Sequence, residues 1–133
     1  MRIQVRTGDI AREPAEVLIT AINSGGMWFG GIDGVIQRAA GKLFHSQAAA
    51  AMPLLDGRTV VARNGGHAHS GAFKNVVFVV DDLQQRLREI IYAGLTAADG
   101  AGFKTVTIPT IRMGVMLGAV EHTVEEAVEE MAL

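Results

Sequence analysis

Cysteine is absent from this sequence of 133 residues. Its absence excludes disulfide bonds, a cysteine nucleophile and a zinc site built on cysteine. Long apolar runs are missing as well, since none approaches the ~20 residues that a membrane-spanning helix requires. The first residues, MRIQVRTGD, alternate and then turn, unlike a signal peptide. We therefore expect a cytoplasmic protein without a membrane segment.

The sequence also lacks any block of like charges, and its net charge is only −2. Non-specific electrostatic binding of nucleic acid is therefore not expected. A narrow site for a nucleotide or one phosphodiester is still possible. Apolar residues are plentiful, at 49% of the chain, and there are 16 glycines. This composition indicates a globular chain with a sizeable core. Because no linker or repeat interrupts it, we expect residues 1–133 to form a single domain.

Buried apolar runs alternate with amphipathic stretches along the chain. Residues 17–22 and 76–80 are apolar throughout, as is typical of central strands that helices cover on both faces. Shorter strands are expected at 3–5, 59–63 and 105–109, and helices at 33–40, 44–52, 83–98 and 119–131. Asp81 or Asp82 is expected to cap the third helix. The alternation predicts a three-layer α/β/α sandwich with a mixed, largely parallel sheet.

A glycine-rich turn joins the first buried strand to the helix after it. Residues 22–41 read INSGGMWFGGIDGVIQRAAG. Glycines let the backbone approach a ligand closely and point N–H groups at it, which suits an anion. In sheets of this kind, ligands bind beyond the carboxyl ends of the central strands. Two loops, at 23–33 and 110–118, have that expected position.

Four segments, in their order along the chain, resemble the macro domain, the ADP-ribose-binding module. They are Gly-Asp-Ile at 8–10, Ala-Ile-Asn at 21–23, the run GGIDGVIQRAAG at 30–41, and Ile-Pro-Thr-Ile with Gly-Val at 108–115. The run at 30–41 is the most specific of them. The resemblance covers most of the chain and implies the macro domain fold.

That resemblance implies a role for each matching residue. Asp9 would accept a hydrogen bond from the adenine amino group, helped by the backbone of Ile10. Asn23 would hold the distal ribose, and Asp33 would orient that ribose or activate a water, so these two are the expected catalytic residues. The other expected ligand contacts are Gly30, Gly31, Ile32, Met113, Gly114, Val115 and Met116. No metal or cofactor is implied.

The implied ligand is ADP-ribose or an ADP-ribosylated protein. We expect hydrolysis of ADP-ribosyl linkages or of O-acetyl-ADP-ribose, because Asn23 and Asp33 are both present. A non-catalytic ADP-ribose reader is the alternative, which an altered second loop favours. Another nucleotide or an RNA phosphate at the same site is a further alternative, against which the lack of basic character counts.

The sequence departs from the family pattern in several places. Met27-Trp28-Phe29 stands where glycines are common, Gln37 where histidine is usual, and Met116 where an aromatic would pack on the distal ribose. Asp81-Asp82 replaces a glycine–proline turn. The chain ends soon after the helix expected at 119–131, where the family often adds a strand and a helix. These departures concern catalysis and the pose of the ligand more than the fold.

Several of these residues also have a purely structural explanation. Asp9 suits a turn, and Asp33 suits an N-terminal helix cap. Trp28 can plug the glycine loop as well as stack on a ligand. His67 and His69 have a His-x-His spacing that could ligate a metal, but no third ligand is evident.

Overall fold

The computed structural model describes residues 10–22, 30–51, 54–66, 69–82 and 84–109. The strand expected at 3–5 and the helix expected at 119–131 lie outside these residues. All statements below concern the described part of the chain.

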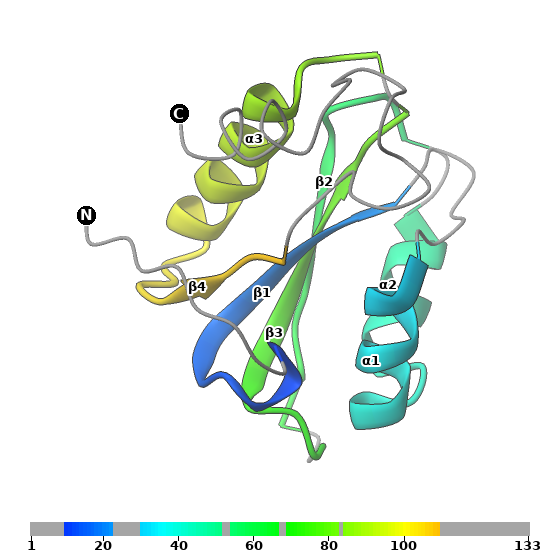
Figure 1. The fold of residues 1–133 in the computed structure, drawn as a ribbon, viewed down its shortest axis with the longest axis vertical. Helices are drawn as coiled ribbons and strands as arrows, with labels where there is room; N and C mark the ends of the chain where they lie inside the picture. The colour runs from blue at the N-terminus through cyan, green and yellow to red at the C-terminus, as the bar shows by residue number, and fades with distance from the viewer. Residues whose placement is uncertain (1–9, 23–29, 52–53, 67–68, 83, 110–133) are drawn as a thin grey trace.

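A four-stranded sheet with the strand order β2-β3-β1-β4 forms the middle layer (Figure 1). Its strands are β1 (Ala15–Ile22), β2 (Thr59–Ala62), β3 (Phe73–Val80) and β4 (Val106–Thr107). β1 runs parallel to β3 and to β4, whereas β2 runs antiparallel to β3. The predicted mixed, largely parallel sheet is therefore confirmed.

Helices cover both faces of this sheet (Figure 1). The 3-10 helix η1 (Ile10–Arg12), α1 (Gly30–Ala40) and α2 (Leu43–Ala51) lie on one side, and α3 (Leu87–Gly100) lies on the other. Each side buries its own apolar cluster. The cluster under α3 includes Val17, Ile19, Val77, Val79 and Ile90, and the cluster under α1 and α2 includes Leu18, Ile22, Ile36, Phe44 and Phe78. The three-layer α/β/α architecture is confirmed.

The two central strands are apolar along most of their length because both of their faces are buried. Side chains alternate between the faces of a strand. In β1, Val17 and Ile19 therefore face α3, while Leu18 faces α1 and α2. Valine and isoleucine also suit the pleated surface, since their branched side chains pack well on it.

Several element boundaries differ from the prediction. α1 begins at Gly30 and not at Asp33, because glycine can adopt helical dihedral angles and the expected turn instead supplies the first helical turn. β3 begins at Phe73 and not at Val76, since its pairing with β1 already starts with Phe73 opposite Ala15. β4 is shorter than predicted and spans Val106–Thr107.

The predicted capping of α3 by Asp81 or Asp82 is wrong. α3 begins at Leu87, its N-cap residue is Arg86, and no side chain caps it. Asp81 is instead held by the sheet: its N–H donates to the Ile22 carbonyl oxygen at 2.7 Å, and the residue is fully buried. Strand pairing thus continues past Val80 and delays the start of the helix.

Gly94 lets α3 lie close against the sheet. A Cβ placed on this residue would stand 2.7 Å from Ile19 Cγ2 and 3.1 Å from Val79 Cγ2. Separations this short force the neighbouring atoms to move, and a packed core resists such movement. The short distance between α3 and the central strands therefore depends on glycine, which has no side chain, at position 94.

Gly94→Ala should lower the free energy of unfolding by about 1–3 kcal/mol, the usual cost of overpacking, although alanine favours a helix by about 1 kcal/mol. Gly100→Ala is the matched control, because Gly100 lies in the same helix and a Cβ there meets nothing within 4 Å. Urea unfolding followed by circular dichroism would compare the two variants. Equal midpoints would contradict the packing described.

Candidate functional site

The carboxyl ends of β1 and β3 lie side by side at one edge of the sheet. Their register places Ile22 opposite Val80, and the Asp81 N–H bond to Ile22 extends the pairing by one residue. α1 begins near this edge and runs back along the sheet (Figure 1). The start of α1 is thus placed beyond the end of a central parallel strand, where ligands bind in such sheets.

The structure brings Ile10 and Ile32 to the same side of the sheet. Both are partly buried and pack against the apolar cluster that contains Leu18, Ile22 and Ile36. Ile10 belongs to η1 and Ile32 to the first turn of α1. Two segments that the resemblance assigns to different ends of one ligand therefore share a common apolar support.

Gly30, Gly31, Ile32 and Asp33 are the first residues of α1. The first N–H groups of an α-helix have no partner within the helix, and the helix dipole places partial positive charge there. This end of a helix therefore favours an anion such as a phosphate. Gly34, the next residue, has the Arg38 side chain close to it, 3.2 Å from an ideal Cβ position.

The other predicted site residues lie outside the described part of the chain. They are Asp9, Asn23, Met113, Gly114, Val115 and Met116. The departures at Met27-Trp28-Phe29 lie outside it too. Their roles stay predictions.

The loop before β2 reaches the same edge of the sheet, and sequence reasoning missed it. The Gly57 N–H donates to the Val80 carbonyl oxygen at 2.8 Å, and the Val80 N–H donates to the Arg58 carbonyl oxygen at 2.7 Å. The Asp82 N–H donates to Asp56 Oδ1 at 2.6 Å. Gly57 has a φ of 81°, a conformation that favours glycine. The Asp56-Gly57 pair, a turn signal directly before a strand, could have indicated this loop.

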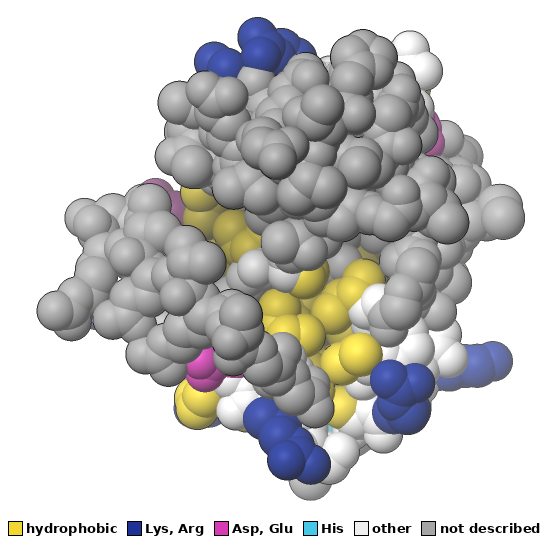
Figure 2. Space-filling view, viewed as in Figure 1, with side chains coloured by type: hydrophobic (Ala, Val, Ile, Leu, Met, Phe, Trp, Pro, Cys, Tyr) yellow, Lys and Arg dark blue, Asp and Glu magenta, His cyan; other side chains and the backbone are white. Residues whose placement is uncertain are grey.

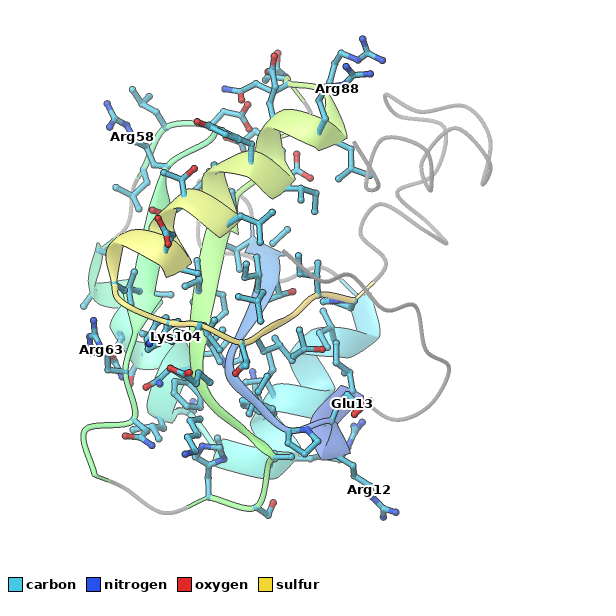
Figure 3. The ribbon with its side chains drawn as sticks, turned by 90° about the vertical axis from the view of Figure 1, so that its left-hand side faces the viewer. Arg12, Glu13, Arg58, Arg63, Arg88 and Lys104 are labelled. Carbon is cyan, nitrogen blue, oxygen red and sulfur yellow. The ribbon has the colours of Figure 1, made fainter. Side chains whose placement is uncertain are left out.

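Charged groups of both signs lie at this end of the molecule. Arg58 and Arg88 are exposed and lie near the end where β3 leads towards α3 (Figure 3). Asp81 is fully buried, and Asp56 is half-buried. Among the described residues, both signs are present at this end of the sheet.

The face drawn in Figure 1 has apolar side chains gathered in its middle and Lys and Arg side chains towards its rim (Figure 2).

Within the described ranges, no helix is long and apolar enough to cross a membrane.

His69 has a packing role, which counts against the His-x-His metal alternative. Its Nδ1 accepts a hydrogen bond from the Gly71 N–H at 3.1 Å. Its ring centroid lies 5.3 Å from that of Phe44 and 5.2 Å from that of Phe73. His67 lies outside the described residues. Among the residues that the structure describes, no group of three or more His, Cys, Asp or Glu could hold a metal ion.

Comparison with solved structures shows the same fold in macrodomains. A Trypanosoma brucei macrodomain in complex with ADP superposes with a TM-score of 0.75 at 20% identity, over 94% of this chain and 52% of that one. A variant of the Oceanobacillus iheyensis macrodomain with ADPR gives a TM-score of 0.72 at 17% identity, over 94% of this chain and 71% of that one. At these identities the likeness concerns the fold alone.

Sequence comparison gives the family. Residues 19–127 match the model described as Macro domain. An O-acetyl-ADP-ribose deacetylase of Cronobacter turicensis is 30% identical over 125 residues, which cover 86% of this chain and 69% of the relative. The family match includes residues 19–22 of β1, the whole of α1 and the whole of α3. The chain belongs to the macro domain family.

Proposed function

We propose that this protein binds ADP-ribose at the edge where β1 ends and α1 begins. The observation that carries the proposal is the placement of Gly30, Gly31 and Ile32 in the first turn of α1, at the carboxyl edge of a largely parallel sheet. In the macro domain resemblance, the backbone around Gly31, Ile32 and Asp33 lines the diphosphate and the distal ribose. This placement supports the proposal, because the first N–H groups of a helix have no intrahelical partner and can donate to a phosphate.

The diphosphate is the part of the ligand that this edge suits best. A diphosphate needs several N–H donors and no obligatory cation, and glycine residues let the backbone come close enough to donate. Glycine also adds no Cβ between the helix backbone and a phosphate oxygen. Met113, Gly114, Val115 and Met116 would cover the diphosphate from the other side.

The adenine and the distal ribose would then lie on opposite sides of the diphosphate. Asp9 would accept a hydrogen bond from the adenine amino group, since a carboxylate is an acceptor-only group. The backbone of Ile10 would help at the same end. The Ile10 side chain packs against the apolar cluster under α1 and α2, and this packing holds the turn in place. Asn23, which directly follows β1, would hold the distal ribose.

We propose further that the protein is a hydrolase acting on ADP-ribosyl or O-acetyl-ADP-ribose linkages. The relative from Cronobacter turicensis is named an O-acetyl-ADP-ribose deacetylase. In deacetylation, water adds to the acetyl carbonyl carbon and the ester C–O bond breaks, which releases acetate and ADP-ribose. Asp33 or a phosphate oxygen of the ligand would take the proton from the water. A non-catalytic reader is the second candidate, favoured by Met27-Trp28-Phe29 and Met116.

Binding is tested by calorimetric titration with ADP-ribose, beside ADP and AMP. The intact protein should bind ADP-ribose. Asp9→Ala should weaken binding about tenfold or more, because a hydrogen bond to a charged group contributes about 1.5–3 kcal/mol. Asp99→Ala, an exposed aspartate at the end of α3, is the control and should bind normally. If ADP-ribose gives neither a heat of binding nor a shift in the unfolding temperature, the proposal that the protein binds ADP-ribose is wrong.

Catalysis is tested with O-acetyl-ADP-ribose and with a mono-ADP-ribosylated protein as substrates. The intact protein should release acetate or ADP-ribose. Asp33→Ala should lower kcat by about a hundredfold or more, within the usual contribution of a positioned acid or base. Asn23→Ala should also lower kcat, because the distal ribose loses the contact that positions it. If the protein binds ADP-ribose but releases neither product, the reader function is correct. Equal turnover by Asp33→Ala would exclude Asp33 from the mechanism.

A further inference from the structure

Asp56 is an acidic side chain bound into the edge of the sheet beside the proposed site. Its Oδ1 accepts the Asp82 N–H at 2.6 Å, a contact between residues that are 26 positions apart in sequence. Its Oδ2 is closed off from solvent and has no hydrogen-bond partner within the described residues. A carboxylate oxygen withdrawn from water is unfavourable, so the loop conformation that places it there must be held by the Oδ1 contact and its neighbours.

The contacts of residues 80–82 alternate in direction. The Val80 N–H donates to Arg58 in the loop, and the Asp81 N–H donates the other way, to Ile22 in β1. The Asp82 N–H then points back to the loop and meets the Asp56 carboxylate. This alternation is that of a β-strand between two partners. The Asp56 side chain therefore takes the place of the next backbone carbonyl and prolongs β3 beyond Val80.

Prolonging β3 fixes the end of β1. The Asp81 N–H reaches the Ile22 carbonyl oxygen at 2.7 Å only while residues 80–82 stay extended. That carbonyl oxygen belongs to the planar peptide group that joins Ile22 to Asn23. The Ile22 carbonyl at the end of β1 is thus held by the Asp81 N–H, and the next N–H, that of Asp82, is held by Asp56.

We propose that Asp56 is a positioning residue that fixes the carbonyl at the end of β1, that of Ile22, the residue directly before Asn23. The inference rests on the proposed function, in which Asn23 holds the distal ribose. Asp56 does not touch the ligand in this proposal. It acts through the backbone of Asp82 and Asp81, so its removal affects the distal ribose and leaves the adenine and diphosphate contacts in place.

The experiment compares affinities for ADP-ribose and for ADP, which lacks the distal ribose. Asp56→Ala should weaken ADP-ribose binding about three- to tenfold, as expected for one lost hydrogen bond, and leave the affinity for ADP unchanged. Asp56→Asn keeps an acceptor oxygen and should bind ADP-ribose within about twofold of the intact protein. Asp99→Ala serves as a control for the loss of an aspartate.

If Asp56 has only a structural role, Asp56→Ala should lower the unfolding temperature. It should then change the affinities for ADP-ribose and ADP by the same factor, or leave both unchanged. Either result for the affinities would overturn the inference. Asp56→Leu has the same number of side-chain atoms without the acceptor, and it replaces the alanine variant if that variant does not fold. If the intact protein fails to bind ADP-ribose, the proposed function fails. If the intact protein binds and Asp56→Leu or Asp56→Ala binds equally well, only the positioning role fails.

Discussion

The parallel pairing of β1 with β3 is the contact on which the rest of the structure depends. Its register runs from Ala15 opposite Phe73 to Ile22 opposite Val80. Because both faces of both strands are apolar, alternation alone does not fix this register. Polar contacts fix it instead: Asn75 Nδ2 donates to the Glu16 carbonyl oxygen at 3.1 Å at one end, and the Asp81 N–H bonds to Ile22 at the other. These contacts decide which residues stand at the carboxyl edge.

The layers on either side follow from the same pairing. The side chains of Ile19 and Val79, one from each central strand, pack against Gly94. α3 therefore fits only while the register keeps Ile19 opposite Val77, two residues before Val79. On the opposite face, Leu18, Ile22 and Phe78 support Ile36 of α1. The start of α1 is therefore anchored to the same strands whose ends form the edge. The proposed site is built at the end of strands that are buried on both faces, which favours a preformed geometry.

The sequence predicted the features that depend on local pattern. Residues 17–22 and 76–80 are uniformly apolar, so buried parallel strands followed directly from composition. Gly30 and Gly31 were read as a turn, since local pattern does not show that a glycine pair takes helical angles. Asp81 was read as a helix cap because nothing near it in sequence reveals its bond to Ile22. The turn at Asp56-Gly57 had a local signal, but its contact with Asp82 had none, since the two residues are 26 positions apart.

The candidate site was predictable to a similar degree. The resemblance named Ile10 and Ile32, and the structure places them against one apolar cluster, an arrangement that neither residue shows alone. It also named residues 30–33, which form the first turn of α1 near the sheet edge; their contact with a ligand stays a prediction. The distance between such segments depends on side-chain packing across the sheet, which a family motif does not contain.

The distribution of free N–H groups favours one orientation for an anionic ligand at this edge. At the end of β3 the N–H groups of Val80, Asp81 and Asp82 all have acceptors within the protein, namely Arg58, Ile22 and Asp56. None of the three can turn to a phosphate without breaking the sheet edge. The first turn of α1 differs, because its N–H groups have no intrahelical partner. In the proposed complex, the diphosphate would therefore lie on the α1 side of this edge.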